Sequence, residues 1–212
     1  MQNTNAVALA AVLAMITTPL LAEEQKTASL GESNFSYSFV GGYLGRITLD
    51  EEINFLGEVY EDFGTAGLNG AVQLADNFAI GAGFGVFANE GNRTEITNSS
   101  LNLSLFFPIP IVDRVDLIPQ VGFVYNEAEA CFDNICATED DSALAYGVGT
   151  RIWVVPGSFE FNAAYSDSDE DNSESTVSLG GALWFREHHS IELNVDRSDS
   201  FDAVTVGYRY SL

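Results

Sequence analysis

Hydrophobic residues alternate with small or polar residues along nearly the whole chain from Asn34 to Leu212. The closing stretch shows this clearly. One set of its alternate positions is apolar and aromatic: Val204, Val206, Tyr208, Tyr210 and Leu212. The other set is small or polar: Ala203, Thr205, Gly207, Arg209 and Ser211. Because successive side chains of a strand point to opposite faces, this period of two predicts a strand with one apolar and one polar face.

About ten segments with this alternation follow one another, and no segment shows a sustained helical period. The connections predicted at 76–77, 108–114, 156–157 and 187–190 are short or turn-like. Those at 49–64, 89–93, 127–141 and 167–174 are polar and mostly longer, and a tight one lies at 198–201. Short turns at one end and longer loops at the other are typical of bacterial outer-membrane barrels. The pattern therefore predicts an all-β fold, a single antiparallel transmembrane β-barrel of ten strands over residues 34–212. An eight-stranded barrel is the alternative, if 66–74 or 191–196 forms a loop.

Composition narrows the class of protein. The 212 residues include 31 acidic and 8 basic side chains, for a formal net charge of −23, which argues against nucleic acid as a partner. Hydrophobic residues make up 46% of the chain, with 15 Phe and 8 Tyr, so the chain is not expected to be disordered.

The N-terminal residues predict export. An apolar run from Ala6 to Leu21 leads to Ala22 and the acidic Glu23-Glu24, as in a secretory signal peptide. We expect a signal peptide over residues 1–22 and a periplasmic linker over 23–33. No later apolar run is long enough for a transmembrane helix, so localisation in the outer membrane requires the barrel.

Cys131 and Cys136 are the two cysteines of the chain and lie close together in a polar segment. In an oxidising compartment this spacing favours a disulfide that closes a small loop. A metal site would need two more ligands, and the two histidines, His188 and His189, are far away in the sequence. We predict the disulfide, no metal site and no cofactor.

The C-terminal segment Val206-Gly-Tyr-Arg-Tyr-Ser-Leu212 resembles the closing strand of the small outer-membrane barrels of the OmpA and OmpX type. The hairpin at 67–78 resembles the second hairpin of a group of barrels that have ten strands. The resemblance implies that Val206, Tyr208, Tyr210 and Leu212 form the signal read by the barrel-assembly machinery. It also implies a monomer in contact with outer-membrane lipid and lipopolysaccharide. It says little about activity.

Charged residues on the face predicted to line the lumen are the strongest candidate site. Alternation assigns to that face Arg46, Arg151, Arg186, Arg209, Glu160, Glu192 and Asp196. A buried unpaired charge is costly, so these residues should pair. Arg151 and Glu160 flank the tight Pro156-Gly157 turn and are the first expected pair. Such a network either plugs the lumen or gates a narrow channel for small solutes, and we favour the plug.

Most of the acidic residues lie in the predicted outer loops. The spacing Asp167-Ser-Asp169-Glu-Asp171 is that of a calcium loop, but Asn172 and Ser178 replace the glycine and glutamate that an EF-hand needs. We therefore expect an acidic surface that binds divalent cations loosely.

His188-His189-Ser190 resembles the His-x-Ser pair of barrel-type lipid A deacylases, although Ile191 follows the serine instead of asparagine. The predicted turn faces the periplasm, whereas that chemistry works on the outer leaflet. A lipid-modifying enzyme is thus a distant alternative. The sequence favours a protein that is not an enzyme, with a plugged lumen and acidic extracellular loops in a structural or surface-interaction role.

Overall fold

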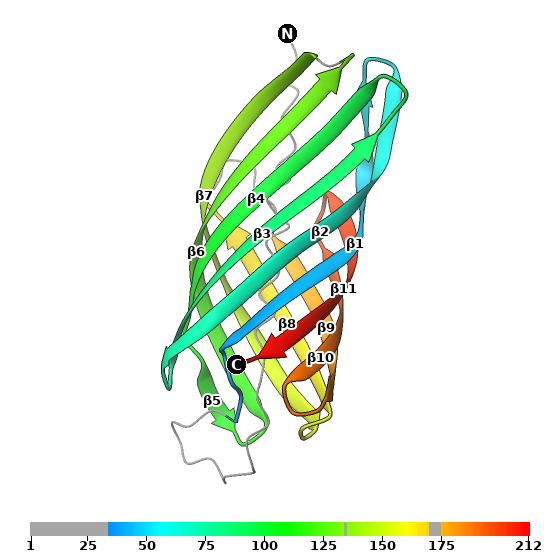
Figure 1. The fold of residues 1–212 in the computed structure, drawn as a ribbon. Coiled ribbons are helices and arrows are strands. Elements are labelled where there is room, and N and C mark those ends of the chain that lie inside the picture. Colours follow the sequence, from blue (N-terminus) through cyan, green and yellow to red (C-terminus); the bar gives the residue numbers. More distant parts are fainter. Residues whose placement is uncertain (1–33, 134, 170–174) are drawn as a thin grey trace.

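The structure, a computed structural model, describes residues 34–133, 135–169 and 175–212 (Figure 1). The predicted signal peptide (1–22) and linker (23–33) lie outside the described residues. The strands are β1 (Phe39–Phe55), β2 (Glu58–Ala75), β3 (Phe78–Glu90), β4 (Thr94–Phe106), β5 (Ile109–Val112), β6 (Val115–Phe132), β7 (Ile135–Val155), β8 (Phe159–Ser168), β9 (Thr176–Phe185), β10 (His189–Arg197) and β11 (Phe201–Ser211). Across the described residues there is no helix with the length and apolar character needed to span a membrane.

Ten of these strands form a closed antiparallel barrel, which confirms the predicted fold. Except for β4 and β5, strands that are neighbours in sequence pair with each other; in addition β1 pairs with β11, and β4 pairs with β6. The short β5 pairs only with the start of β6, as part of the connection from β4. Closure leaves no unpaired edge, which is the condition for a sheet to cross a bilayer.

The strands are staggered around the barrel. A walk along paired residues leaves β6 at Asp116 and returns to β6 at Ala128, twelve residues further on. The walk passes through Arg151, Asn162, Gly180, Asn194, Thr205, Gly45, Thr65, Phe87 and Asn98. Such a stagger tilts the strands against the barrel axis, as Figure 1 shows. It also decides which inward residues lie at the same level.

The outer face of the barrel is an apolar band. Large hydrophobic side chains stand exposed on every long strand, among them Leu44, Leu68, Phe84, Leu103, Phe123, Val148, Leu179, Leu193 and Val206. Aromatic rings flank this band at one end, where Phe78 contacts Phe107 and Phe185 stacks on His189. An apolar band with an aromatic border is the lipid-facing surface of an outer-membrane barrel.

The two ends of the barrel differ. The terminal end holds Phe39 and Ser211, which pair with each other near the two ends of the described chain. At the opposite end, here called the hairpin end, β1–β2 and β6–β7 extend beyond the shorter β8–β11 (Figure 1). The predicted loops at 49–64 and 127–141 are in fact the arms of these hairpins, which end in turns at Leu56-Gly57 and after Phe132. Positive φ angles of 53° and 90° at Leu56 and Gly57 suit a two-residue hairpin turn.

The inward side chains form two hydrophobic layers. The terminal layer contains Phe35, Tyr37, Phe39, Phe106, Ile118, Trp153 and Trp184. The hairpin layer contains Ile47, Leu49, Tyr60, Phe63, Phe87 and Phe201. Small and polar residues line the lumen between the two layers, so the lumen is not uniform along its axis.

Candidate functional site

The terminal layer contains a buried ion pair between Arg151 and Glu160, which were expected to pair. Glu160 lies opposite Trp153 on β7, so it is diagonal to Arg151. The guanidinium donates from Nε to Oε1 at 2.5 Å and from Nη2 to Oε2 at 2.7 Å. Trp184 donates its indole N–H to the same carboxylate at 3.2 Å. Both partners are almost completely buried, so neither charge is screened by bulk water.

A second buried ion pair joins Glu192 on β10 to Arg209 on β11. Arg209 donates to the carboxylate from Nη2 at 2.8 Å, and its other terminal nitrogen completes the pair. Ser190 donates its hydroxyl to Glu192 Oε1 at 3.2 Å. The guanidinium of Arg209 also lies 5.0 Å above the Phe39 ring, in cation–π geometry.

The chain before β1 crosses the terminal opening of the barrel. Asn34 donates to the carbonyl of Asp113 at 2.7 Å, in the turn before β6. Phe35 stacks on Trp153 with ring centroids 5.4 Å apart, and the Tyr37 hydroxyl donates to Asp116 at 2.6 Å. The Arg151 guanidinium lies over the Phe35 and Tyr37 rings. The alternation in the sequence starts at Asn34, but β1 begins only at Phe39.

In the middle of the lumen, side chains lie flat on glycines of neighbouring strands. A Cβ at Gly67 would collide with the Tyr43 ring. The other overlaid glycines are Gly83 under Asn102, Gly122 under Ser104, Gly147 under Gln120, and Gly180 under Asn162 and Asn194. This level of the lumen is therefore lined by polar side chains that contact the wall of the barrel.

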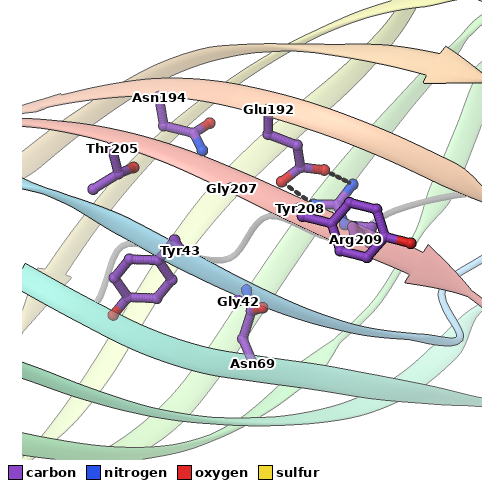
Figure 2. A pocket seen from close by; sticks show the side chains of 9 residues that line it. All are labelled: Gly42, Tyr43, Asn69, Glu192, Asn194, Thr205, Gly207, Tyr208 and Arg209. Carbon is purple, nitrogen blue, oxygen red and sulfur yellow. Dashed lines mark hydrogen bonds and ion pairs between the residues drawn. The ribbon is translucent and has the colours of Figure 1, made fainter.

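A pocket lies on one part of this wall (Figure 2). Asn194 and Thr205 border it on one side, and Tyr43 and Asn69 border it on the other. The Glu192–Arg209 pair lies at its terminal side. The pocket thus connects the second ion pair to the polar middle of the lumen.

Charged residues connect the β1–β2, β3–β4 and β6–β7 hairpins at the hairpin end of the barrel. The Glu58 carboxylate, on the β1–β2 hairpin, accepts hydrogen bonds from the Thr94 hydroxyl and from the backbone N–H groups of Asn92 and Arg93. Arg93 in turn pairs with Asp133 at the β6–β7 turn. The Thr94 hydroxyl and these N–H groups lower the pKa of Glu58 below its usual value. The hydrogen bond from Arg93 likewise lowers the pKa of Asp133.

Two of the predicted lumen residues are elsewhere, which corrects the sequence-based assignment. Arg46 faces outward from β1 and pairs with Asp62 on β2, with Nε 2.8 Å from Oδ1. Because Phe39 and Ile47 are the inward residues of β1, Arg46 falls on the opposite face. Arg186 is exposed in the turn between β9 and β10 with a φ of 54°. The strand ends at Phe185, so alternation no longer applies there.

The other predicted residues lie as follows. Asp196 is buried on the inward face of β10. Val206, Tyr208, Tyr210 and Leu212 face outward into the apolar band. Cys131 and Cys136 form a disulfide across the β6–β7 arms. The stretch Asp167–Asp171 lies partly outside the described residues, and Asp169 accepts a hydrogen bond from the Leu144 N–H at 2.7 Å.

Of the lumen residues around this site, Tyr37 and Trp153 were not identified from the sequence, whereas alternation had placed Trp184 on the inward face and Asp116 near a turn. The Arg151–Glu160 pair is surrounded by Tyr37, Trp153 and Trp184. Asp116 accepts a hydrogen bond from the Tyr37 hydroxyl. Alternation does assign Asp116 and Trp153 to the lumen face, on which Ile118 and Arg151 also lie. A signal for them was thus available, but an aromatic residue facing the lumen contradicts the simple rule that apolar residues face lipid.

His188 and Ser190 lie in different surroundings. Ser190 is buried in the lumen and donates to Glu192. The Nδ1 atom of His188 has no hydrogen-bond partner among the described residues, and its ring lies against Tyr210. His189 faces outward, where its Nδ1 is 2.6 Å from the Tyr208 hydroxyl.

No protein-family model matches this chain, and no curated protein matches it. Several solved structures do. The translocator domain of the autotransporter NalP from Neisseria meningitidis is 8% identical with a TM-score of 0.50, and the match covers 82% of this chain and 88% of that one. The attachment invasion locus protein Ail of Yersinia pestis is 14% identical with a TM-score of 0.44, and the KdgM porin is 7% identical with a TM-score of 0.48. Both of these matches cover 82% of this chain and 99% of the other. At such identities the likeness shows the fold alone.

Proposed function

We propose that this barrel of the outer membrane is closed at its terminal end and acts at the cell surface through its acidic hairpins. One observation supports closure above all others. Residues 34–38 cross the terminal opening and pack Phe35 and Tyr37 over the buried Arg151–Glu160 pair. The hydrophobic hairpin layer narrows the lumen a second time.

Charge supports the surface role. The β6–β7 hairpin bears Glu127, Glu129, Glu139, Asp140 and Asp141 in addition to Asp133, and Arg93 is the one cation paired with this hairpin among the described residues. The disulfide between Cys131 and Cys136 stiffens the hairpin near its tip. In the orientation usual for such barrels, the long hairpins face the exterior and the short turns face the periplasm. The hairpins would then present a rigid acidic surface outside the cell.

A narrow channel for small solutes is the second candidate, because polar groups line the middle of the lumen. Planar-bilayer recording of the refolded protein separates the two candidates. We expect little or no steady conductance from the wild type, since two layers of aromatic side chains obstruct the lumen. The double variant Phe35→Ala/Tyr37→Ala removes the side chains that cross the terminal opening and should raise the frequency of open events. The outward variant Phe123→Ala serves as its control and should match the wild type. A stable, ion-selective current from the wild type would contradict closure.

We also propose that the barrel does not modify lipid A. Ser190 faces the lumen and is engaged by Glu192, so it has no contact with an outer-leaflet lipid. Lipid A mass spectra from cells that express the wild type and from cells that express His188→Ala should therefore be identical. An acyl chain that is missing only when His188 is present would show that the enzyme alternative is correct.

A further inference from the structure

The middle of the lumen contains a carboxylate that no arginine neutralises. Asp196 is 2% exposed and lies on the inward face of β10, two residues from Asn194. Ser178, its cross-strand neighbour on β9, forms a hydrogen bond to it. The Oδ1 atom of Asp196 has no hydrogen-bond partner among the described residues. One oxygen of this buried carboxylate therefore has its hydrogen-bonding capacity unused by the described residues.

The nearby basic groups are already occupied. The two arginines of the lumen, Arg151 and Arg209, are paired with Glu160 and Glu192. Within the described ranges, the other arginines are exposed, toward one end of the barrel or the other: Arg46, Arg93, Arg114, Arg186 and Arg197. A buried carboxylate without a counterion is costly, so either a proton or a bound cation must neutralise it.

Neutral oxygen atoms are available at the same level of the barrel. Asn194 and Thr205 lie directly opposite each other on β10 and β11, beside Asp196. Carboxylate, amide and hydroxyl oxygens are the ligands that hard cations prefer.

We propose that the middle of the lumen binds one monovalent cation, Na⁺ or K⁺, with Asp196 as the anchoring carboxylate. Charge decides between monovalent and divalent ions. One carboxylate balances one positive charge, whereas a calcium ion held by Asp196 alone would leave a net buried charge. Calcium sites usually recruit several carboxylates among six to eight oxygen ligands. Ser178 holds Asp196 in place and offers a further oxygen to the ion.

The test uses the refolded barrel in detergent at pH 7 and constant ionic strength, with choline chloride replaced stepwise by NaCl or KCl. A ligand that binds only the folded state raises the free energy of unfolding. Once the ligand concentration exceeds the dissociation constant, this increase grows with the logarithm of the ligand concentration. The thermal midpoint of the wild type should rise with Na⁺ or K⁺, and this dependence should be at least tenfold weaker in Asp196→Asn. The control Glu139→Gln, which removes an exposed acid of the β6–β7 hairpin, should respond as the wild type does.

Infrared spectroscopy supplies an independent readout. If Asp196 is ionised and bound to a cation, the wild-type-minus-Asp196→Asn difference spectrum at pH 7 contains no band of a protonated carboxyl group. Such a band, or an equal cation response in both proteins, would overturn the proposal. If Asp196→Asn does not refold, Ser178→Ala replaces it. A response reduced at least threefold then supports the site, and an unchanged response contradicts it.

Discussion

Replacing Arg151 with alanine is expected to lower the free energy of unfolding by about 3–5 kcal/mol, because it leaves Glu160 buried without its counterion. Trp184 still donates to the carboxylate, but a single neutral donor does not replace a bidentate guanidinium. The change should appear as a lower denaturation midpoint in guanidinium chloride. Trp153 and Trp184, the two tryptophans of the chain, are both buried next to the pair and report on it by fluorescence.

The controls separate the loss of the pair from the loss of a charge. Arg46→Ala breaks the exposed pair with Asp62 and should leave the denaturation midpoint nearly unchanged, because water screens exposed pairs. The double variant Arg151→Met/Glu160→Leu removes both buried charges while keeping volume, and it should be more stable than Arg151→Ala. If Arg151→Ala and Arg46→Ala unfold at the same denaturant concentration, the buried pair does not stabilise the terminal layer.

Placing an arginine on the outer face at mid-height should be nearly as damaging. Leu68 lies on β2 midway between Asp62 at the hairpin end and Leu74 near the terminal turn. Its side chain is 67% exposed and lies among other exposed apolar side chains. In a bilayer, Leu68→Arg should destabilise the barrel by about 2–4 kcal/mol, the cost of a lipid-facing arginine near the midplane. Reversible unfolding in lipid vesicles gives this difference directly.

The matched control is Ile135→Arg at the tip of the β6–β7 hairpin. Ile135 is 77% exposed, even more than Leu68, yet it lies beyond the apolar band. We therefore expect no measurable loss of stability from it. If the two variants were equally stable, the surface around Leu68 would face water, and the assignment of the band to lipid would be wrong.

The alternation of apolar residues predicts the lipid-facing side of some strands and not of others. It identifies which residues share a face, and on β11 it also assigns the faces correctly, since the apolar set from Val204 to Leu212 faces outward. On β1 the same rule assigns the wrong set to lipid, because Phe39 and Ile47 fill the two hydrophobic layers inside the barrel. A lumen that contains aromatic layers has apolar residues on both faces, so apolarity no longer distinguishes lipid from lumen.

The long hairpins illustrate a second limit. Residues 49–64 and 127–141 were predicted to be loops because they are acidic and lack an apolar alternation. The structure shows paired strands there. On the β7 arm both faces are exposed from Ile135 to Ser142, so the period of two disappears from the sequence while the backbone pairing continues. In the β1–β2 hairpin the acidic residues obscure an inward apolar set, since Leu49, Tyr60 and Phe63 belong to the hairpin layer. The alternation therefore marks the membrane-spanning part of a strand and not the end of the strand.

Short-range features could be predicted from the sequence, because strands that are adjacent in most of this antiparallel sheet are also consecutive along the chain. Ten alternating segments indicate ten strands. The tight turn at Pro156-Gly157 brings Arg151 close to Glu160, and a polar hairpin brings Cys131 opposite Cys136. Only the closed tertiary structure decides the rest. The pairings of β1 with β11 and of β4 with β6, and the twelve-residue stagger, determine which inward side chains share a level. They bring Tyr37 to Asp116 and leave Asp196 without an arginine, since contacts across a barrel depend on closure, which no local pattern encodes.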